Sequence, residues 1–345
     1  MQFLIRHDVC LRALNTFGLK ARAARFVTLQ TVEQLMALRE SPEWDAGPRL
    51  ILGGGSNILF AGNFSGLVVQ IAFAGRALVG TTDGDRLVRV AAGENWHQTV
   101  MWTLDSGWPG LENLASIPGT CGAAPIQNIG AYGVELAQRF DSLEAFDVDD
   151  RRLVTLSREE CRFAYRDSLF KQAGRDRYVI TAITLRLHGA WTPVLEYGDV
   201  RKTLQARGIT TPDAQAVASA IMSIRAARLP DPALLGNAGS FFKNPLVEAG
   251  VYASIKAREP DVVGYVQPDG SYKLAAAWLI ERCGWKGRSV SPGGEAAVHD
   301  RQALVLVTRG QATGAEVLAL AAAIRHDVFA RFGVELEAES LIVGI

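Results

Sequence analysis

The segment from Leu114 to Tyr132 contains no Asp, Glu, Lys or Arg and is dense in Gly, Ala, Pro and Ile. A loop of this length is uncommon inside a compact domain and is usually functional. Its small residues leave backbone amides accessible, which suits a pyrophosphate, and its apolar surface suits a flat heteroaromatic ring. The alternative is a glycine-rich loop packed for structural reasons alone. Residues 94–106 before it are predicted to be helical, and residues 143–148 after it to form a strand.

Length and charge limit the class of protein. With 345 residues the chain exceeds what one hydrophobic core usually supports, so two or three domains are expected. The 36 basic and 36 acidic side chains cancel, which disfavours nucleic acid or an anionic membrane as a partner. No signal-peptide core and no run of about 20 apolar residues is present, so we expect a soluble cytoplasmic protein without membrane insertion. Four distant cysteines predict reduced thiols, and five scattered histidines give no metal-ligand spacing.

The first third of the chain alternates helix and strand signals. Thr31 and Gln34 have the spacing of a capping box, and apolar residues from Val32 to Leu38 follow at helical spacing. Residues 15–72 are therefore predicted to form a small α/β unit. Short apolar runs predict strands at residues 49–52, 57–60, 67–71 and 87–91.

The middle of the chain carries a long strand signal at residues 178–187. Thr211 and Pro212 predict the N-cap and first turn of a helix that continues to Ile224. The stiff Leu229-Pro230-Asp231-Pro232 follows, and we place a domain boundary nearby.

The last third predicts a helix from Lys273 to Cys283, a buried strand at residues 303–308, and a helix that Thr313 opens and Gly333 ends. At the chain end, Val334, Leu336 and Ala338 alternate with Glu335, Glu337 and Glu339. This alternation predicts a strand with three carboxylates on one face, for which a solvated face is the ordinary explanation.

Gly53-Gly54-Gly55-Ser56-Asn57 follows a predicted strand, and successive glycine amides can bind phosphate oxygens. The spacing is not that of the dinucleotide fingerprint, because an extended apolar segment follows where a helix should begin. No Gly-Lys dipeptide occurs, which excludes a P-loop. A tight turn without a ligand is the alternative.

The segment from Gly236 to Pro245 has the composition of a working site. Ser240 lies between glycines that allow close backbone approach and the pair Phe241 and Phe242, which we interpret as a dry wall that excludes water. Lys243 and Asn244 supply groups for an anion or a carbonyl. The alternative is a turn that leads into a strand with buried phenylalanines.

Other signals are weak or have ordinary explanations. Ser168-Leu169-Phe170-Lys171 matches Ser-x-x-Lys, but the motifs that accompany it in penicillin-recognising enzymes are absent, as are Gly-x-Ser-x-Gly and His-Glu-x-x-His. Arg166 can pair with Asp167, and Tyr197 can be a loop aromatic. Arg225 and Arg228 near a helix C-terminus complement the helix dipole without any ligand.

Seven short motifs occur in one order along nearly the whole chain. The motifs are Asn15-Thr16-Phe17-Gly18, Ile51 to Asn57, Ser116-Ile117-Pro118-Gly119, Pro125 to Gly133, Tyr165-Arg166-Asp167-Ser168, Gly236 to Pro245, and Leu336-Glu337-Ala338-Glu339. Each motif is modest by itself, but the ordered set is highly specific. In that order they resemble the UDP-N-acetylenolpyruvoylglucosamine reductase family of bacterial peptidoglycan synthesis. The segment Leu195 to Asp199 resembles the tyrosine loop of the family's type I members.

The resemblance implies an α+β protein with an FAD-binding fold of the vanillyl-alcohol-oxidase/PCMH type. Two α/β subdomains (residues 1–72 and 73–228) are expected to hold non-covalent FAD, and an α+β domain (residues 229–345) to bind a UDP-sugar substrate. NADPH is implied as the co-substrate that reduces FAD, and a monomer is expected. The flavin would then deliver hydride to the terminal carbon of an enolpyruvyl ether, and a proton would be added at the carbon that bears the carboxylate.

The same resemblance implies roles for individual residues. Ser240 matches the general acid, and Arg166 and Glu339 match the pair that stabilises the enol intermediate, with Glu339 as a protonated donor. The substrate-binding positions are Tyr197, Arg228, Asn244, Lys286 and Gln302. The FAD-binding positions are Gly53, Gly54, Gly55, Ser56, Asn57, Ser116, Ile117, Pro118, Gly119, Gln127, Asn128, Gly130, Ala131, Tyr132 and Gly133.

Two positions depart from the family pattern. Arg228 stands where many relatives have lysine, which keeps the charge but changes the donor geometry. Leu341 stands where relatives often have arginine, which puts a secondary contact to the substrate carboxylate in doubt. Two alternatives stay open: a flavin oxidase of the same fold, and a non-catalytic nucleotide-binding module.

Overall fold

The computed structural model describes residues 3–344, and the chain divides into two compact units. The first unit contains the N-terminal residues up to Val9 together with Ala23–Gly55 and Ser65–Ala227. The second contains Cys10–Arg22, Ser56–Phe64 and the chain from Arg228 onward. The domain limits expected at residues 72 and 228 stay predictions.

The first sheet has the strand order β1-β2-β5-β3. Strands β3 and β5 run parallel, and Thr31 caps helix α1, since its side chain accepts from the N–H of Gln34. The fully buried Leu35, Leu38 and Trp44 pack on this sheet. The elements are β1 (Arg6–Cys10), β2 (Arg22–Leu29), α1 (Val32–Arg39), α2 (Pro42–Asp45), β3 (Arg49–Leu52) and β5 (Phe64–Ile71).

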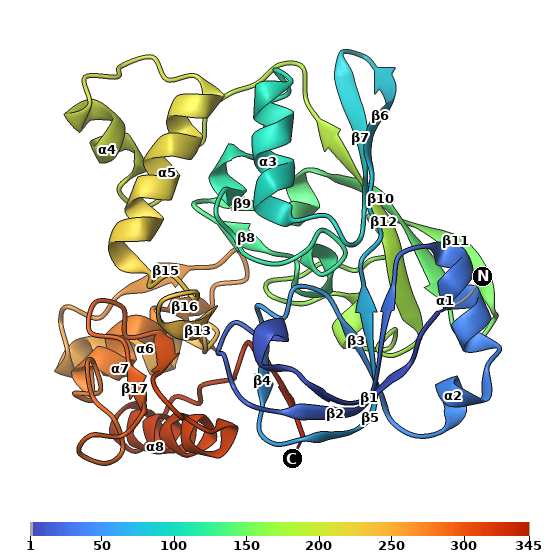
Figure 1. The fold of residues 1–345 in the computed structure, drawn as a ribbon. Helices are drawn as coiled ribbons and strands as arrows, with labels where there is room; N and C mark the ends of the chain where they lie inside the picture. Colours follow the sequence, from blue (N-terminus) through green and yellow to red (C-terminus); the bar gives the residue numbers. More distant parts are fainter. Residues whose placement is uncertain (1–2, 345) are drawn as a thin grey trace. The chain divides into compact units, whose positions relative to one another are not determined.

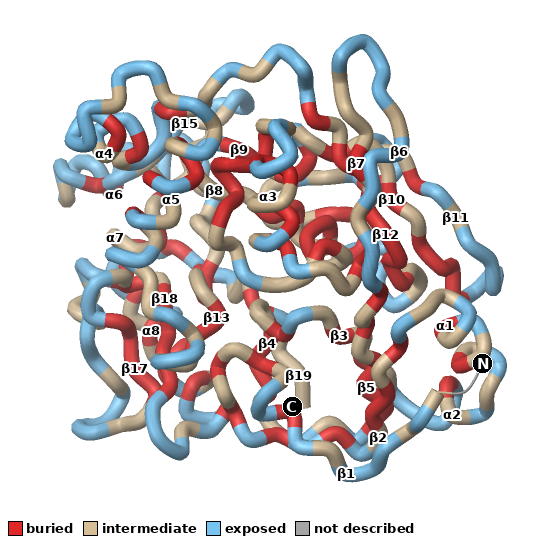
Figure 2. The backbone as a smooth tube through the Cα atoms, turned by 45° about the horizontal axis from the view of Figure 1, so that its top comes forward, coloured by how far each residue is buried: buried red, intermediate tan, exposed pale blue. Residues whose placement is uncertain are grey.

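The second sheet belongs to the first unit and has the order β11-β10-β12-β7-β6, with every neighbouring pair antiparallel. Trp96, Val100 and Leu104 of helix α3 share one core with its strands, and burial is continuous along most of β12 (Figures 1 and 2). The elements are β6 (Arg76–Thr82), β7 (Asp85–Ala91), α3 (Trp96–Asp105), β10 (Phe140–Asp147), β11 (Arg152–Ser157) and β12 (Tyr178–Leu187).

The uncharged loop contains short elements only. It begins at the last residue of the 3-10 helix η2 (Glu112–Leu114) and contains the 3-10 helix η3 (Ala124–Gln127). Strand β8 (Gly130–Ala131) then begins the small hairpin that β9 (Val134–Glu135) completes. The 3-10 helices η1 (Arg12–Leu14), η4 (Leu136–Gln138) and η5 (Leu169–Lys171) lie elsewhere in the chain.

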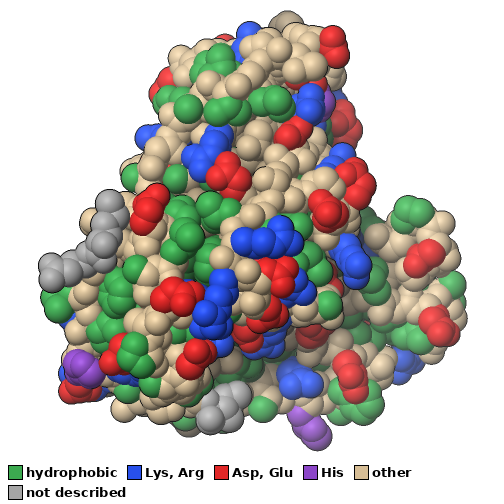
Figure 3. Space-filling model, turned by 90° about the vertical axis from the view of Figure 1, so that its right-hand side faces the viewer, with side chains coloured by type: hydrophobic (Ala, Val, Ile, Leu, Met, Phe, Trp, Pro, Cys, Tyr) green, Lys and Arg blue, Asp and Glu red, His purple; other side chains and the backbone are tan. Residues whose placement is uncertain are grey.

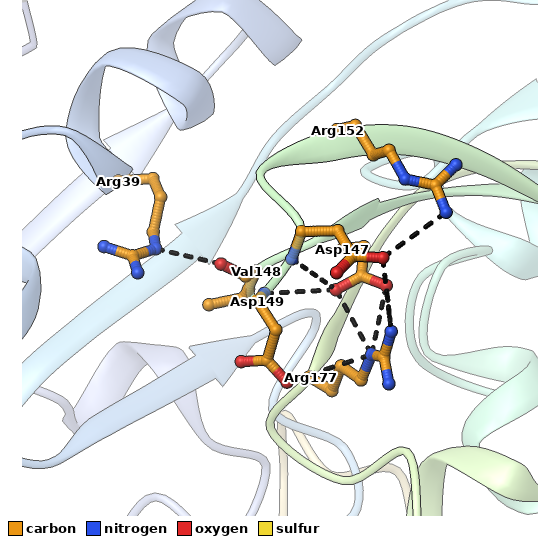
Figure 4. A network of polar contacts seen from close by, with 7 residues as sticks. Arg39, Asp147, Val148, Asp149, Arg152 and Arg177 are labelled. Atoms are coloured by element: carbon orange, nitrogen blue, oxygen red, sulfur yellow. Dashed lines mark hydrogen bonds and ion pairs between the residues drawn. The ribbon is translucent and has the colours of Figure 1, made fainter.

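A buried carboxylate closes the turn between β10 and β11 (Figure 4). Asp147 accepts from the N–H groups of Asp149 and Asp150, both at 3.1 Å, and from Arg177, whose closest nitrogen is 2.7 Å away. Burial opposes ionisation of Asp147, but the Arg177 guanidinium and the two N–H donors lower its pKa. Arg39 donates to the carbonyl of Val148 at 3.1 Å, which joins this turn to helix α1.

Helices α4 (Val200–Ala206) and α5 (Ala214–Arg228) follow the second sheet. The expected cap of α5 at Thr211 is wrong, because the helix begins at Ala214 and Asp213 accepts from the N–H of Ala216 at 2.7 Å. Aspartate is an equally good cap, so the sequence signal was two residues out of place.

The second unit contains three small sheets. Their orders are β13-β18-β17, β14-β16-β15, and the parallel pair β19-β4. One core joins them to helices α6, α7 and α8. The elements are β4 (Ile58–Phe60), β13 (Gly236–Ser240), β14 (Leu246–Val247), α6 (Ala249–Arg258), β15 (Gly264–Val266), β16 (Tyr272–Leu274), α7 (Ala276–Arg282), β17 (Ala296–Val298), β18 (Val305–Thr308), α8 (Gly314–Phe332) and β19 (Leu341–Val343).

Helix α8 confirms its sequence prediction at both ends. Thr313 and Glu316 form a reciprocal capping box, and Gly333 ends the helix in a left-handed conformation with φ 66°. A neighbouring prediction needs correction. Lys273 belongs to strand β16, so helix α7 begins later, at Ala276.

The end of the chain is not the long strand that its alternation predicted. Val334 and Leu336 are buried and Glu335 and Glu337 exposed, as alternation requires, but Glu339 is half-buried. Residues 334–340 form no regular strand and have one bridge, at Ala338, before the regular strand β19. Glu339 therefore does not share the solvated face of the other two glutamates.

Basic and acidic side chains are intermingled on the face drawn in Figure 3. Over residues 3–344, no helix is both long enough and apolar enough to cross a membrane.

Candidate active site

The glycines that follow β3 lie against residues 119–120 of the uncharged loop. A Cβ on Gly54 would be 2.9 Å from the Cα of Gly119, and one on Gly53 would be 2.5 Å from Oγ1 of Thr120. Side chains are excluded from Gly54, because the neighbouring backbone cannot move aside. Two of the predicted cofactor segments thus lie side by side in the first unit.

Backbone hydrogen bonds hold the uncharged loop against the start of α3. The N–H of Gly122 donates to the carbonyl of Ala92 (2.9 Å), and the N–H of Trp96 to the carbonyl of Gly119 (3.0 Å). The Trp96 indole donates to the carbonyl of Leu114 (3.0 Å). The loop is therefore an integral part of the first unit rather than a flexible connection.

Asn128 lies in the same loop and is almost fully buried. Its Nδ2 donates to the Glu135 carboxylate (3.0 Å) and to the carbonyl of Ala164 (3.1 Å), and its Oδ1 accepts from the N–H of Ala137 (2.9 Å). These protein contacts occupy the side chain. A cofactor contact at Asn128 would therefore use its backbone.

Arg166 lies in a tight turn with φ 53°, closed by reciprocal backbone hydrogen bonds between Ala164 and Asp167 (3.0 and 3.2 Å). Its guanidinium lies 5.3 Å from the centre of the Tyr165 ring and donates to the carbonyl of Gly130 at 2.8 Å. The half-buried Arg166 is therefore brought beside the predicted cofactor segment at residues 130–133.

The predicted tyrosine loop packs against that same segment. A Cβ on Gly133 would lie 3.4 Å from the Cβ of Tyr197, and one on Gly198 would lie 3.5 Å from the Tyr132 ring. Asn113 links both parts, since its Nδ2 donates to the carbonyls of Tyr132 (2.8 Å) and Val194 (2.9 Å). Tyr197 is 47% exposed, so about half of its surface is accessible.

Arg225 on helix α5 is a candidate that sequence reasoning passed over, because the helix dipole offered an ordinary explanation. Its Nε is buried and has no hydrogen-bond partner among the described residues. Burial lowers the pKa of Arg225, and burial together with Arg225 lowers the pKa of His97. His97 Nδ1 in turn accepts from the N–H of Ser116 at 3.2 Å. No sequence signal distinguishes Arg225 from other arginines at helix ends.

In the second unit, Ser240 ends β13 after a bulge. Gly239 has φ 70°, and its N–H donates to Oδ1 of Asn237 at 2.9 Å. The ladder between β13 and β18 loses its register here and resumes with Ser240 opposite Val305. The bulge re-aims the half-buried Ser240 relative to a regular strand.

The Asn15-to-Gly18 motif supports the same strand. The N–H of Asn237 donates to the carbonyl of Thr16 at 3.0 Å. The hydroxyl of Thr308 donates to the carbonyl of Phe17 at 2.5 Å. A Cβ on Gly236 would lie 2.2 Å from the carbonyl oxygen of Phe17. This N-terminal motif is thus structural and fixes the start of β13.

The interpretation of Phe241 and Phe242 as a wall of the site is wrong. Each residue is only 1% exposed, and their rings meet edge to face at 5.0 Å within the core of the second unit. The Phe241 ring also lies edge to face with the Phe17 ring, with 6.4 Å between the ring centroids. Because the rings present almost no surface, they stabilise the strand end that carries Ser240 instead of lining a cavity.

Glu339 is brought next to the Ser240 segment although 99 positions separate the two residues. The N–H of Glu339 donates to the carbonyl of Phe241 at 2.8 Å, and Ala338 forms a bridge with Phe242. The second unit therefore contains both the predicted proton donor and one member of the predicted enol-stabilising pair.

Apart from Tyr197 of the first unit, the predicted substrate residues lie in the second unit. Asn244 Oδ1 accepts from the N–H of Ala276 at 3.0 Å, so Asn244 caps helix α7. Lys286 Nζ pairs with Glu281 at 2.9 Å, and the carbonyl of Gln302 accepts from the N–H of Val305 at 3.0 Å. Arg228 is exposed at the end of α5.

Two features of the first unit fit a flavin dinucleotide. The close contact at Gly54 and Gly119 leaves backbone without side chains, which suits a diphosphate. The buried, unpaired guanidinium nitrogen of Arg225 suits an electron-rich carbonyl or anion. Residues of the segments 53–55, 116–119 and 130–133 would hold the cofactor.

Comparison with known proteins identifies the class. Residues 23–157 match the family described as an FAD binding domain, and residues 231–343 match the C-terminal domain of UDP-N-acetylenolpyruvoylglucosamine reductase. The fold matches the crystal structure of UDP-N-acetylenolpyruvylglucosamine reductase from Thermus caldophilus with a TM-score of 0.69 and 23% identity, over 99% of both chains. The protein is an FAD-dependent oxidoreductase.

Two curated relatives identify the family. UDP-N-acetylenolpyruvoylglucosamine reductase of Paraburkholderia phytofirmans is 55% identical over 95% of both chains. The protein of the same name from Burkholderia mallei is 56% identical over 96% of this chain and 95% of its own length. The chain belongs to the UDP-N-acetylenolpyruvoylglucosamine reductase family.

Proposed function

We propose that this protein reduces UDP-N-acetylglucosamine enolpyruvate to UDP-N-acetylmuramate with NADPH as electron donor, in peptidoglycan precursor synthesis. Likeness to named reductases over nearly the full chain supports this proposal. The observation that carries it is the pairing of Glu339 with the Ser240 segment in one unit, through the 2.8 Å hydrogen bond to Phe241.

The chemistry requires one hydride and one proton. FAD, when bound, would supply the hydride with NADPH as its reductant, and the enolpyruvyl double bond would accept it at the terminal carbon. Negative charge then develops on the side of the substrate carboxylate as an enolate, so hydrogen-bond donors that are already in place lower the barrier. A proton added at the carbon next to the carboxylate completes the saturated lactyl ether.

The proposed roles follow from the chemistry of each side chain. Arg166 and Glu339 stabilise the enol, Arg166 with a permanently charged guanidinium and Glu339 as a protonated donor. Ser240 donates the proton to carbon. A serine hydroxyl is a weak acid, so the transfer depends on a strongly basic carbanion within hydrogen-bond reach.

The substrate's diphosphate and sugar are proposed to contact Tyr197, Arg228, Asn244, Lys286 and Gln302. Tyr197 belongs to a loop with accessible surface, and Asn244 is fixed by its cap of α7. Lys286 would exchange its exposed ion pair with Glu281 for a substrate phosphate, and such an exposed pair is weak.

The test separates the two half-reactions in Ser240→Ala. Reduction of the flavin by NADPH should stay within about two-fold of wild type, whereas reoxidation by the enolpyruvyl substrate should slow by at least about 100-fold. Ser254→Ala is the matched control, because Ser254 is exposed on α6. Equal loss in both half-reactions would refute the role of Ser240.

Two further outcomes would refute the whole proposal. Colourless purified protein would favour a non-catalytic nucleotide-binding module. Oxygen-dependent oxidation of NADPH that the enolpyruvyl substrate leaves unchanged would favour a flavin oxidase.

A further inference from the structure

Asn57 ends the Gly-Gly-Gly-Ser-Asn motif, and the family resemblance predicts that it contacts the cofactor. In the second unit its side chain contacts the C-terminal segment. Nδ2 donates to the carbonyl of Glu339 at 3.3 Å, and Oδ1 accepts from the hydroxyl of Ser340 at 2.9 Å. Its carbonyl accepts from the N–H of Leu341 at 3.0 Å. One residue thus contacts three consecutive residues more than 280 positions away.

These contacts complete the hydrogen bonding of the Glu339 peptide. Its N–H donates to the carbonyl of Phe241, and its carbonyl accepts from Asn57. The bridge between Ala338 and Phe242 lies just before it, and the parallel pairing of Leu341 with Ile58 begins two residues after it. Glu339 lies at the junction of two pairings with different partners. Its backbone direction therefore depends on the residue that joins them.

The side chain of Asn57 suits this junction because an amide offers a donor and an acceptor together. The carbonyl of Glu339 requires a donor, and the hydroxyl of Ser340, a residue that is only 5% exposed, donates to an acceptor. Aspartate has nearly the same shape but only acceptors when ionised. It would place a carboxylate oxygen against the carbonyl of Glu339.

We propose that Asn57 is a positioning residue that fixes the Glu339 peptide and so directs the Glu339 carboxyl group toward the enol. This inference rests on the proposed function, because it assumes that Glu339 stabilises the enol. A side chain on a misdirected peptide loses its place in the site, and displacements of about 1 Å can cost 100-fold in rate.

The experiment compares Asn57→Asp and Ser340→Ala with Asn63→Ala. Asn63 is a matched control. It lies six residues after Asn57, and its Oδ1 accepts from the N–H of Arg22 rather than from the C-terminal segment. Flavin content, flavin reduction by NADPH and flavin reoxidation by the enolpyruvyl substrate are measured separately, and thermal unfolding identifies variants that fail to fold.

We expect Asn57→Asp to keep its flavin and its rate of reduction within about two-fold. Reoxidation at saturating substrate should slow by about 100-fold while the half-saturating substrate concentration changes little. Ser340→Ala, which removes one of the contacts without touching Asn57, should slow the same step by about 5-fold. Asn63→Ala should leave reoxidation unchanged. Loss of flavin from Asn57→Asp would instead make Asn57 a cofactor residue and overturn the inference.

A double-mutant cycle separates this inference from the proposed function. If Asn57 acts through Glu339, then Asn57→Asp should have almost no further effect in a Glu339→Ala background. Independent, multiplying effects would overturn the positioning role. If Glu339→Ala alone leaves reoxidation unchanged, the assigned role of Glu339 itself fails.

Discussion

Arg166 and Glu339 are proposed to act on the same intermediate, but the chain holds them in different ways. Arg166 lies in a turn closed by Ala164 and Asp167, and its guanidinium donates to the carbonyl of Gly130, 36 positions away. Glu339 is held by Phe241 and Asn57, which are 98 and 282 positions away.

The two residues differ in the loop entropy that is lost when they are positioned. Closing a turn of four residues requires little loop entropy, whereas joining segments that are hundreds of residues apart requires a folded unit around them. We therefore expect the Glu339 segment to depend on the core of the second unit, and the Arg166 turn to keep its shape when its own side chain is changed.

The largest effect is expected for Phe242→Ala. Removal of this buried ring should lower the free energy of unfolding by about 3–5 kcal/mol, because it leaves a cavity beside Phe241 and removes packing under the bridge to Ala338. Chemical denaturation measures this loss. Flavin reoxidation should also slow, since Glu339 loses its support. An unchanged rate of reoxidation would contradict the expected dependence of the Glu339 segment on the core of the second unit.

A smaller effect is expected for Arg166→Lys, and it should be confined to the reaction. Lysine keeps the charge but loses the planar fork that reaches Gly130, so reoxidation by substrate should slow by about 100-fold. The free energy of unfolding should stay within about 0.5 kcal/mol of wild type, because the backbone closes the turn. A larger loss of stability would show that the turn depends on its arginine.

A smaller effect again is expected for Asp147→Asn, in another locally closed turn. The pKa of Asp147 lies below its ordinary value of 3.8 in the folded protein, so ionised Asp147 stabilises the fold above that pH. The variant should be less stable by about 1–2 kcal/mol at pH 7. The difference from wild type should shrink as the pH falls through the lowered pKa of Asp147. Urea unfolding at pH 7, 5 and 3 measures it.

Glu144→Gln is the control for the Asp147 experiment. Glu144 forms an ion pair with Arg89, and both side chains are 38% exposed. Its loss should change stability by less than about 1 kcal/mol at pH 7. A difference between Asp147→Asn and wild type that stays constant with pH would show that shape, not charge, holds the turn.

Local patterns in the sequence predicted elements that packing then preserved. The capping box at Thr313 and the glycine at Gly333 set both ends of α8, and the run at residues 178–187, rich in β-branched and apolar residues, became the largely buried strand β12. The cap of α5 and the start of α7 were misplaced by two and three residues, since neighbouring residues offered competing caps and strand pairings.

Candidate residues could be found in the sequence where the backbone requires a particular residue type. They were missed where their role depends on burial in the folded protein. The close approach of Gly54 and Gly119 required glycine, so a motif could reveal it. Arg225 has no such signature, because nothing in a helix sequence tells whether its Nε will be buried without a hydrogen-bond partner. The sequence was compatible with Phe241 and Phe242 either in the wall of a site or in the hydrophobic core. The structure places both in the core.

By itself the sequence determined the periodic elements, the glycine loops and, through its ordered motifs, the family. These properties depend on residues that are close along the chain or on identities that a motif records. Only the tertiary structure decided that Asn57 contacts Glu339 and Ser340, and that Glu339 leaves the solvated face of its neighbours. The physical reason is that burial and long-range hydrogen bonds depend on which distant segments meet, and local patterns do not encode that.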